Sequence, residues 1–174
     1  ANSVWMGIHA GANDFAHGHV DLGSFEYESN GVRFASEMGK DDYNLPGYWD
    51  TNVRNLYVTR AEGHNVYVIN PDIGAGQEVR ASSEIEQVVS KPQGSIYTID
   101  MTPAYISDVQ KATRAFMLSN QKRVFTVQDE ILPSGNDEYY WFWHTVADVN
   151  ILDDGKTVIL TNDGRQAKLY FDSN

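Results

Sequence analysis

Residues 24–37 read SFEYESNGVRFASE, and this stretch decides the fold class. Its two halves, Ser24–Ser29 and Val32–Glu37, alternate apolar and polar side chains, which is typical of half-buried β-strands. Between them stands Asn30-Gly31, a dipeptide that type I′ hairpin turns favour because both central residues need a positive φ. The stretch therefore predicts a β-hairpin with one face turned toward a core.

The same pattern continues along the chain. Further turn signals, Asp154-Gly155 and Asp163-Gly164, separate the last of the predicted strands. The other runs rich in Val, Ile, Tyr, Phe and Thr are His64–Asn70, Ser95–Met101, Lys122–Ile131, Glu138–Ala147, Thr157–Thr161 and Ala167–Phe171.

Little of the sequence favours a helix. Only Pro103–Lys111, with Thr102 as a candidate N-cap, predicts one short helical turn. Lys40–Asn55 is rich in Asp, Asn, Gly, Pro and Tyr and predicts a long loop of the kind that carries function, and Pro71–Gln77 predicts a turn. We expect a single all-β domain over residues 1–174, an antiparallel sandwich or layered sheet assembly with few or no helices.

Composition excludes several classes of protein. The 174 residues carry 13 Lys and Arg against 24 Asp and Glu, a net charge of −11, which argues against nucleic acid or an anionic membrane surface as a partner. There is no cysteine, so disulfide and thiolate chemistry are excluded. The chain begins without Met and has no signal peptide at its start, so we expect a mature fragment or an excised domain.

A histidine pair marks the entry to the predicted hairpin. His17 and His19 are two apart, and on an extended backbone they would share a face with Asp21. This spacing is common among metal ligands, because Zn²⁺ accepts imidazole nitrogen and carboxylate oxygen, but two loop histidines that bond locally would look the same.

Two later residues complete a candidate ligand set. Glu37 ends a predicted strand, where it is either an ordinary solvated side chain or an inward carboxylate that needs a cation. His64 opens the strongest Val/Tyr/Ile run, where a satisfied core histidine is the alternative. Together His19, Glu37 and His64 would give the two imidazoles and one carboxylate that zinc sites use.

Over about its whole length the chain resembles the C-terminal β-domain of heparinase II/III-like polysaccharide lyases. The paired motifs H-x-H-x-D-x-x-S-F and G-H-N are specific together and weak singly. The residues that carry the resemblance are His17-Gly18-His19, Asp21, Ser24-Phe25, Gly31-Val32-Arg33-Phe34-Ala35, Gly39, Asp42-Tyr43, Arg54, Tyr57, Arg60, Ala61-Glu62-Gly63-His64-Asn65-Val66, Asp100-Met101-Thr102-Pro103-Ala104-Tyr105, Val127-Gln128-Asp129-Glu130-Ile131 and Trp143-His144-Thr145.

The resemblance implies a function for the whole protein. Such lyases cut uronic-acid polysaccharides of the heparin, heparan sulfate or alginate kind by β-elimination, and they carry an N-terminal α/α toroid that this chain lacks. His17 corresponds to a histidine of the catalytic cleft, and His19, Glu37 and His64 correspond to the ligands of a structural zinc ion. The family commonly has Asp where this chain has Glu37. A catalytic Tyr and a group that neutralises the substrate carboxylate come from the toroid, so the isolated chain is expected to be inactive.

Elimination explains why these groups are needed. The site must neutralise the uronate carboxylate, remove the C5 proton and protonate the departing 4-oxygen. An imidazole such as that of His17 suits the proton transfer, with Asp21 as a nearby orienting group.

Substrate recognition has several candidates. Arg54 and Arg60 would bind carboxylate or sulfate with their guanidinium forks, although structural ion pairs are an equal alternative. Tyr43, with Tyr48 and Trp49, would stack on sugar rings or pack under the loop. The aromatic run Tyr139–Trp143 favours core packing, and His9 and His144 are expected to be structural.

The resemblance also implies a setting for the protein. We expect an anionic polysaccharide substrate, a periplasmic or extracellular location, no nucleic-acid or membrane partner, and a chain able to form a homodimer. Two other readings stay open at this point. One is a cupin-like metal-binding enzyme, although Gly23 and Ser24 stand where the cupin motif needs a glutamate. The other is a noncatalytic carbohydrate-binding β-sandwich that uses the aromatic residues and no metal.

Overall fold

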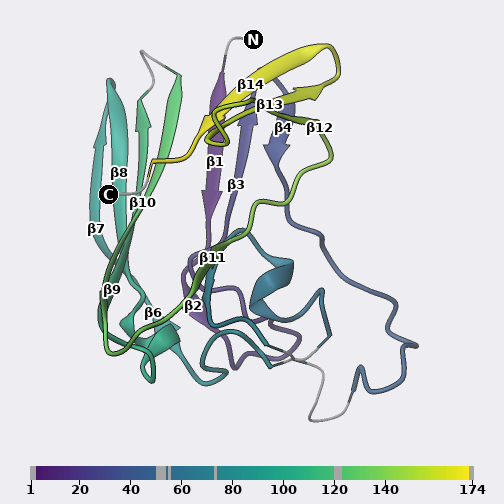
Figure 1. Cartoon of the computed structure of the whole chain (residues 1–174), viewed down its shortest axis with the longest axis vertical. Coiled ribbons are helices and arrows are strands. Elements are labelled where there is room, and N and C mark those ends of the chain that lie inside the picture. The colour runs from purple at the N-terminus through teal and green to yellow at the C-terminus, as the bar shows by residue number, and fades with distance from the viewer. Residues whose placement is uncertain (1–2, 50–53, 55, 73, 120–122, 173–174) are drawn as a thin grey trace.

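The computed structural model describes residues 3–49, 54, 56–72, 74–119 and 123–172. Antiparallel strands dominate it, as Figure 1 shows, and the all-β prediction is confirmed. The strands are β1 (Val4–Ile8), β2 (Gly11–Ala12), β3 (Phe25–Ser29), β4 (Val32–Ala35), β5 (Tyr67–Ile69), β6 (Ser82–Ser83), β7 (Ile85–Lys91), β8 (Gly94–Asp100), β9 (Val109–Ser119), β10 (Val124–Pro133), β11 (Tyr139–Trp141), β12 (Asp148–Ile151), β13 (Thr157–Asn162) and β14 (Arg165–Tyr170).

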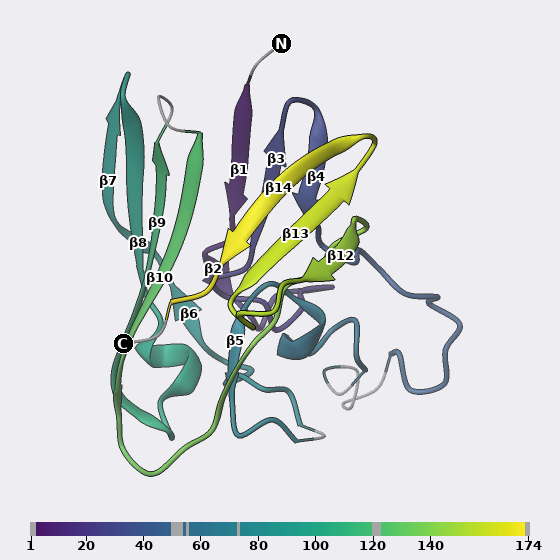
Figure 2. The same cartoon turned by 45° about the horizontal axis from the view of Figure 1, so that its top comes forward.

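The strands form layered sheets. One sheet has the order β1-β3-β4 and another the order β10-β9-β8-β7, and in Figures 1 and 2 the second sheet stands beside the first. A third sheet, β12-β13-β14, lies across the end of β4, where the Asn162 side-chain amide donates to the Arg33 carbonyl at 3.0 Å. The pairs β5–β11 and β2–β6 complete the assembly.

The predicted hairpin forms as expected. Asn30 and Gly31 have φ values of 57° and 77°, so both central residues of the turn adopt the left-handed conformation. Beyond the turn, β3 places Phe25 and Tyr27 in the core, and β4 adds Phe34. Apolar burial of this kind contributes roughly 1.5–3 kcal/mol for each large side chain.

An aromatic cluster fills the space between the first two sheets. Phe25 of β3 lies 5.9 Å from Phe116 of β9 and 5.2 Å from Phe125 of β10, measured between ring centroids. Trp141 and Trp143 pack on the same ring at 5.8 and 5.4 Å. The prediction that the Tyr139–Trp143 run packs into the core is therefore confirmed for its two tryptophans, while Tyr139 and Tyr140 are exposed.

The helical prediction is half right. A short 3₁₀ helix, η3, spans Thr102–Tyr105, and the chain then turns into β9 from Val109 instead of continuing as a helix. The N-cap is Met101 and not Thr102, and the Thr102 backbone N–H donates to the Asp100 carboxylate at 2.9 Å. A second short 3₁₀ helix, η2, spans Ala61–Gly63. No helix among the described residues is long and apolar enough to cross a membrane.

Gly63 gives a direct test of the packing around η2. A Cβ atom at this position would stand 2.2 Å from the Tyr57 carbonyl oxygen, so the backbone of one segment must move. We expect Gly63→Ala to lower the free energy of unfolding by about 1–3 kcal/mol in urea titrations, as overpacking does. Gly135→Ala is the matched control, because its Cβ would meet nothing closer than 3.6 Å. Equal stability of the two variants would contradict the packing.

Candidate functional site

The loop between β2 and β3 carries both histidines of the H-x-H motif, and buried amide side chains anchor it. Asn13 is fully buried, and its side chain donates to the Gln77 side-chain oxygen at 3.1 Å and accepts from the Asp21 backbone N–H at 3.1 Å. Gln77 in turn donates to the Leu22 carbonyl and to the Tyr105 hydroxyl, both at 3.0 Å. These bonds fix the loop at both ends without any regular secondary structure.

His17 sits at a turn of this loop, which corrects the expectation of an extended backbone. Its φ is 63°, and the following Gly18 donates its N–H to the Phe15 carbonyl at 2.8 Å. Because the backbone is left-handed there, the rule that residues two apart share a face does not apply. His17 is exposed and lies edge-on to Trp49, with 5.4 Å between ring centroids, and 6.5 Å from Tyr43.

Asp21 also has a different neighbour from the one expected. Its carboxylate oxygen lies 3.6 Å from the Nε2 atom of His9. Its backbone N–H serves to close the loop onto Asn13. The interaction found for the Asp21 carboxylate is thus with His9 and not with His17.

The three predicted metal ligands lie close together. The Glu37 carboxylate accepts hydrogen bonds from the Ser24 hydroxyl and from Nδ1 of His64. The ring of His19 lies 5.1 Å from that of His64, which is only 2% exposed. The structure therefore brings His19, Glu37 and His64 together from three segments that are far apart in the sequence.

Burial and charge set the protonation of this group. Burial raises the pKa of the Glu37 carboxyl, but the hydrogen bonds from His64 and Ser24 and the nearby His64 charge outweigh it, so the pKa falls below its usual value. The pKa of His19 is also lowered, first by burial and then by the neighbouring His64. An anionic carboxylate beside a neutral His19 imidazole is the protonation state that metal binding requires.

The donor set fits zinc in kind. Two imidazoles and a carboxylate are zinc ligands, and Nε2 of His64 is buried without a hydrogen-bond partner. The carboxylate oxygens of Glu37 are already engaged, and within the described residues no group of three His, Asp or Glu side chains is arranged to hold a metal ion. Zinc at this position stays a prediction.

Asn65 ties the segments of the site together. Its backbone N–H donates to the Ser24 hydroxyl at 3.2 Å, and its side chain donates to the carbonyls of Phe25 at 2.8 Å and Ser36 at 3.1 Å. Its side-chain oxygen accepts the backbone N–H of His144 at 2.6 Å. The sequence assigned no role to this residue, although it stands in the G-H-N motif directly after His64.

Arg114 supports the same segments from the core side. It is fully buried, and its Nη1 donates to the carbonyls of Gly23 at 2.9 Å and Asn65 at 3.1 Å. Its Nε and Nη2 pair with the Asp129 carboxylate at 2.7 and 2.8 Å, and the Trp141 indole N–H donates to that carboxylate at 2.9 Å. Sequence reasoning missed Arg114, because a single arginine inside a strand gives no pattern.

The predicted substrate-binding arginines contact the protein itself. Arg54 Nη2 lies 3.3 Å from the Phe15 carbonyl and 3.5 Å from that of Asn13, so it braces the His17 loop. Arg60 pairs with the buried Glu62 at 2.7 Å. The ring of Tyr43, the third candidate, lies beside His17, and the Lys40 ammonium is 4.5 Å from its centroid.

His144 lies at the edge of the site. The Tyr57 hydroxyl is 3.3 Å from its Nε2 atom, and its Nδ1 is buried without a hydrogen-bond partner. Burial lowers the pKa of His144, and the nearby Glu37 carboxylate only partly offsets this. The residue was expected to be structural, and the backbone bonds of His144 with Asn65 and Ser36 agree with that role.

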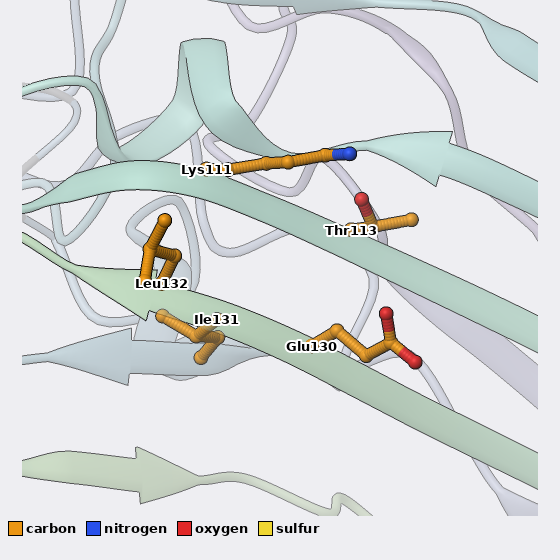
Figure 3. A pocket seen from close by; sticks show the side chains of 5 residues that line it. All are labelled: Lys111, Thr113, Glu130, Ile131 and Leu132. Atoms are coloured by element: carbon orange, nitrogen blue, oxygen red, sulfur yellow. The ribbon is translucent and has the colours of Figure 1, made fainter.

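A surface pocket elsewhere does not coincide with these residues. Lys111 and Thr113 of β9 line it together with Glu130, Ile131 and Leu132 of β10, as Figure 3 shows. None of the predicted catalytic, metal-binding or substrate-binding residues lines it. The candidate site is thus the cluster around His17 and His64.

Comparison with known proteins identifies the family. A family model described as heparinase II/III-like, C-terminal, matches residues 3–174. Comparison with curated proteins gives no match.

Solved structures agree with the family match. A mutant of the heparan sulfate lyase HepC from Pedobacter heparinus superposes with a TM-score of 0.71 at 18% identity, covering 93% of this chain and 24% of that chain. A heparinase III with methylated lysines superposes with a TM-score of 0.74 at 20% identity, over 95% of this chain and 24% of that chain. At such identities the likeness shows the fold alone, and this chain spans about a quarter of the length of those two enzymes. By the match over residues 3–174, the chain belongs to the heparinase II/III-like C-terminal domain family.

Proposed function

We propose that this chain is the C-terminal β-domain of a polysaccharide lyase that cleaves a uronic-acid polysaccharide, heparan sulfate-like or alginate-like, by β-elimination. One observation carries the proposal: the exposed His17 stands beside Tyr43 and Trp49, and it lies two residues before His19, whose ring meets that of the buried His64, the partner of Glu37. Family membership and the similarity to a heparan sulfate lyase and a heparinase III support it.

The reaction assigns His17 a defined task. Elimination breaks the C5–H and C4–O bonds of the uronate, forms the C4–C5 double bond and leaves a proton on the departing oxygen. His17 exchanges the proton at C5 or at the departing oxygen, because its imidazole is exposed and is held in place by a rigid loop. The remaining proton donor and the group that neutralises the carboxylate belong to the α/α toroid of the full-length enzyme.

The substrate contacts follow from the same geometry. Tyr43 offers a ring face next to His17, and Arg54 reaches the loop that carries it. The guanidinium of Arg60 lies 6.0 Å from the ring centroid of Tyr57. We assign Arg54 and Arg60 to carboxylate or sulfate groups of the polymer, which guanidinium groups bind well. Each would do so in addition to its contact within the protein, Arg54 with the Phe15 carbonyl and Arg60 with Glu62.

A metal ion is part of the proposal. His19, Glu37 and His64 would hold zinc, which when bound supplies positive charge and cross-links the loop before β3 to the segments around Glu37 and His64. The chain's own part is to orient these side chains. The Ser24 hydroxyl donates to the Glu37 carboxylate and so orients it. The Asn65 backbone N–H in turn donates to the Ser24 hydroxyl.

Metal analysis tests this part separately. We expect purified full-length protein to contain about one zinc ion per chain by elemental analysis, since one three-ligand set is present. His64→Ala and His19→Ala should each lose the metal and lower the thermal unfolding midpoint. His9→Ala is the control, because His9 pairs with Asp21 outside the ligand set and should retain zinc. Zinc-free wild-type protein after growth with added zinc would refute the ligand assignment.

The activity belongs to the full-length protein. The similar solved chains are about four times as long as this one, which supports a further domain that completes the active site. The isolated 174 residues should therefore leave uronate polymers intact. Substrates of this size are met outside the cytoplasm, and we place the enzyme in the periplasm or the extracellular space.

A panel of polymers tests the proposal. Full-length protein is incubated with heparan sulfate, heparin, alginate and a neutral glucan, and the ultraviolet absorbance of the unsaturated product is followed. We expect absorbance to rise with at least one uronate polymer and not with the glucan. Binding to these polymers without any cleavage would instead support a noncatalytic carbohydrate-binding domain, the second candidate that the exposed Trp49 favours.

A further inference from the structure

Three aromatic side chains form a patch on the loop that follows β4. We call Tyr43, Tyr48 and Trp49 the aromatic platform; their ring centroids are 5.0 to 5.3 Å apart in each pairing. Figures 1 and 2 show this loop, drawn in blue, running out from the sheets after β4. His17 from the loop before β3 touches the platform at its edge.

Trp49 is both exposed and held in place. Its side chain is 64% exposed, yet its indole N–H donates to the Tyr43 carbonyl at 2.9 Å and its ring rests against the buried Tyr48. Leaving a large ring in water costs free energy that a structural role would not require. A fixed ring also loses little conformational entropy when a ligand stacks on it.

One cation, Lys40, stands beside the platform and can meet an anionic group of a ligand. Lys40 places its ammonium 4.5 Å from the ring centroid of Tyr43. The neighbouring carboxylates bond within their own loop: that of Asp42 accepts from the backbone and side chain of Asn44, and that of Asp41 accepts from the backbone of Asp42. An aromatic face beside a lysine suits a sugar ring that has an apolar C–H face and an acidic substituent.

We propose that Trp49 is a specificity-determining residue, whose indole stacks on the uronate-polymer sugar next to the unit on which His17 acts, while Lys40 pairs with that sugar's carboxylate or sulfate. This inference rests on the proposed function for its substrate class. It assigns a binding subsite to the loop after β4, one that lies entirely within this chain.

Kinetics on the full-length protein give the first test. Trp49→Ala is expected to raise KM for the polymer about tenfold or more, as the loss of a central stacked tryptophan does, with kcat changed by less than about twofold. Trp49→Phe should recover most of the affinity. The matched control is Trp5→Ala, since Trp5 is 46% exposed and carries the Arg33 guanidinium 5.6 Å from its ring centroid on β1, away from His17.

Binding gives the second test and separates the two proposals. A size-defined heparan sulfate hexasaccharide, or an alginate hexasaccharide if alginate is the polymer cleaved, is titrated into full-length protein while tryptophan fluorescence is followed. We expect the fluorescence change to vanish in Trp49→Phe and to persist in Trp5→Phe. If binding depends on Trp49 but no polymer is cleaved, the lyase proposal is refuted and the proposed sugar-binding subsite is supported. Normal cleavage with an unchanged KM in Trp49→Ala would refute the subsite alone.

Discussion

Full-length protein carrying His17→Ala should lose about 10²- to 10⁴-fold in kcat, the range that removal of a proton-transferring side chain produces. The imidazole is exposed at a left-handed turn and touches Trp49 and Tyr43, which places it where a sugar ring would lie. Because the loop is anchored through Asn13 and Gln77, the substitution should leave the fold intact. Initial rates of double-bond formation with saturating polymer measure the effect.

Two further variants separate chemistry from binding at this position. His17→Gln keeps a hydrogen-bonding side chain but cannot transfer a proton near neutral pH, so it should be as slow as His17→Ala. His9→Ala removes another exposed histidine, the one that pairs with Asp21, and should retain full activity. A His17→Ala enzyme with undiminished kcat would show that the proton transfer belongs to another group.

Arg114→Ala is expected to lower the free energy of unfolding by about 3–5 kcal/mol, because it leaves the Asp129 carboxylate, whose side chain is only 14% exposed, without its ion-pair partner. Burial alone would lower the pKa of the Arg114 guanidinium, but Asp129 raises it above its usual value, so the arginine is charged in the fold. The substitution also removes both bonds to the carbonyls of Gly23 and Asn65. The zinc content of the Arg114→Ala variant should also be lower than that of the wild-type protein.

An exposed ion pair of the same length is the control. Arg33 on β4 lies 2.7 Å from the Glu26 carboxylate, but its side chain is 42% exposed. Solvent screens such a pair, so Arg33→Ala should change stability by less than about 1 kcal/mol. Urea unfolding of both variants tests the difference. Similar losses in the free energy of unfolding would mean that Arg114 does not stabilise the segments of the site.

The strands with regular alternation were predictable, and those with a polar residue in the core were not. The hairpin of β3 and β4 follows from its apolar spacing and from Asn30-Gly31, both of which act locally. In contrast, β9 has Arg114 on its inward face, between Ala112 and Phe116. The charge breaks the apolar alternation, and only the long-range partner Asp129 makes its burial tolerable.

The edge strand β12 was missed for a different reason. All four residues of β12 are exposed. Because the strand has no buried face, its sequence does not need to alternate apolar and polar residues. The sequence indicated only the turn that follows it, Asp154-Gly155. Pairing with β13 supplies the structure that its own composition does not specify.

The sequence predicted the residues of the candidate site but not the residues that hold them in place. The resemblance named His17, His19, Glu37 and His64, and the last three do meet. Their meeting depends on Asn65, which bonds residues 29 and more positions away along the chain. The positive φ of His17 was missed as well, because the extended-strand argument assumed a β backbone at this position.

The reaction itself offers the most direct test of the account. Full-length protein is given heparan sulfate or alginate in water labelled with heavy oxygen, and the products are weighed by mass spectrometry. Elimination predicts products that carry a C4–C5 double bond and no label from the water, since no water is added across the glycosidic bond. Saturated products that have gained labelled oxygen would mean hydrolysis and would contradict the account.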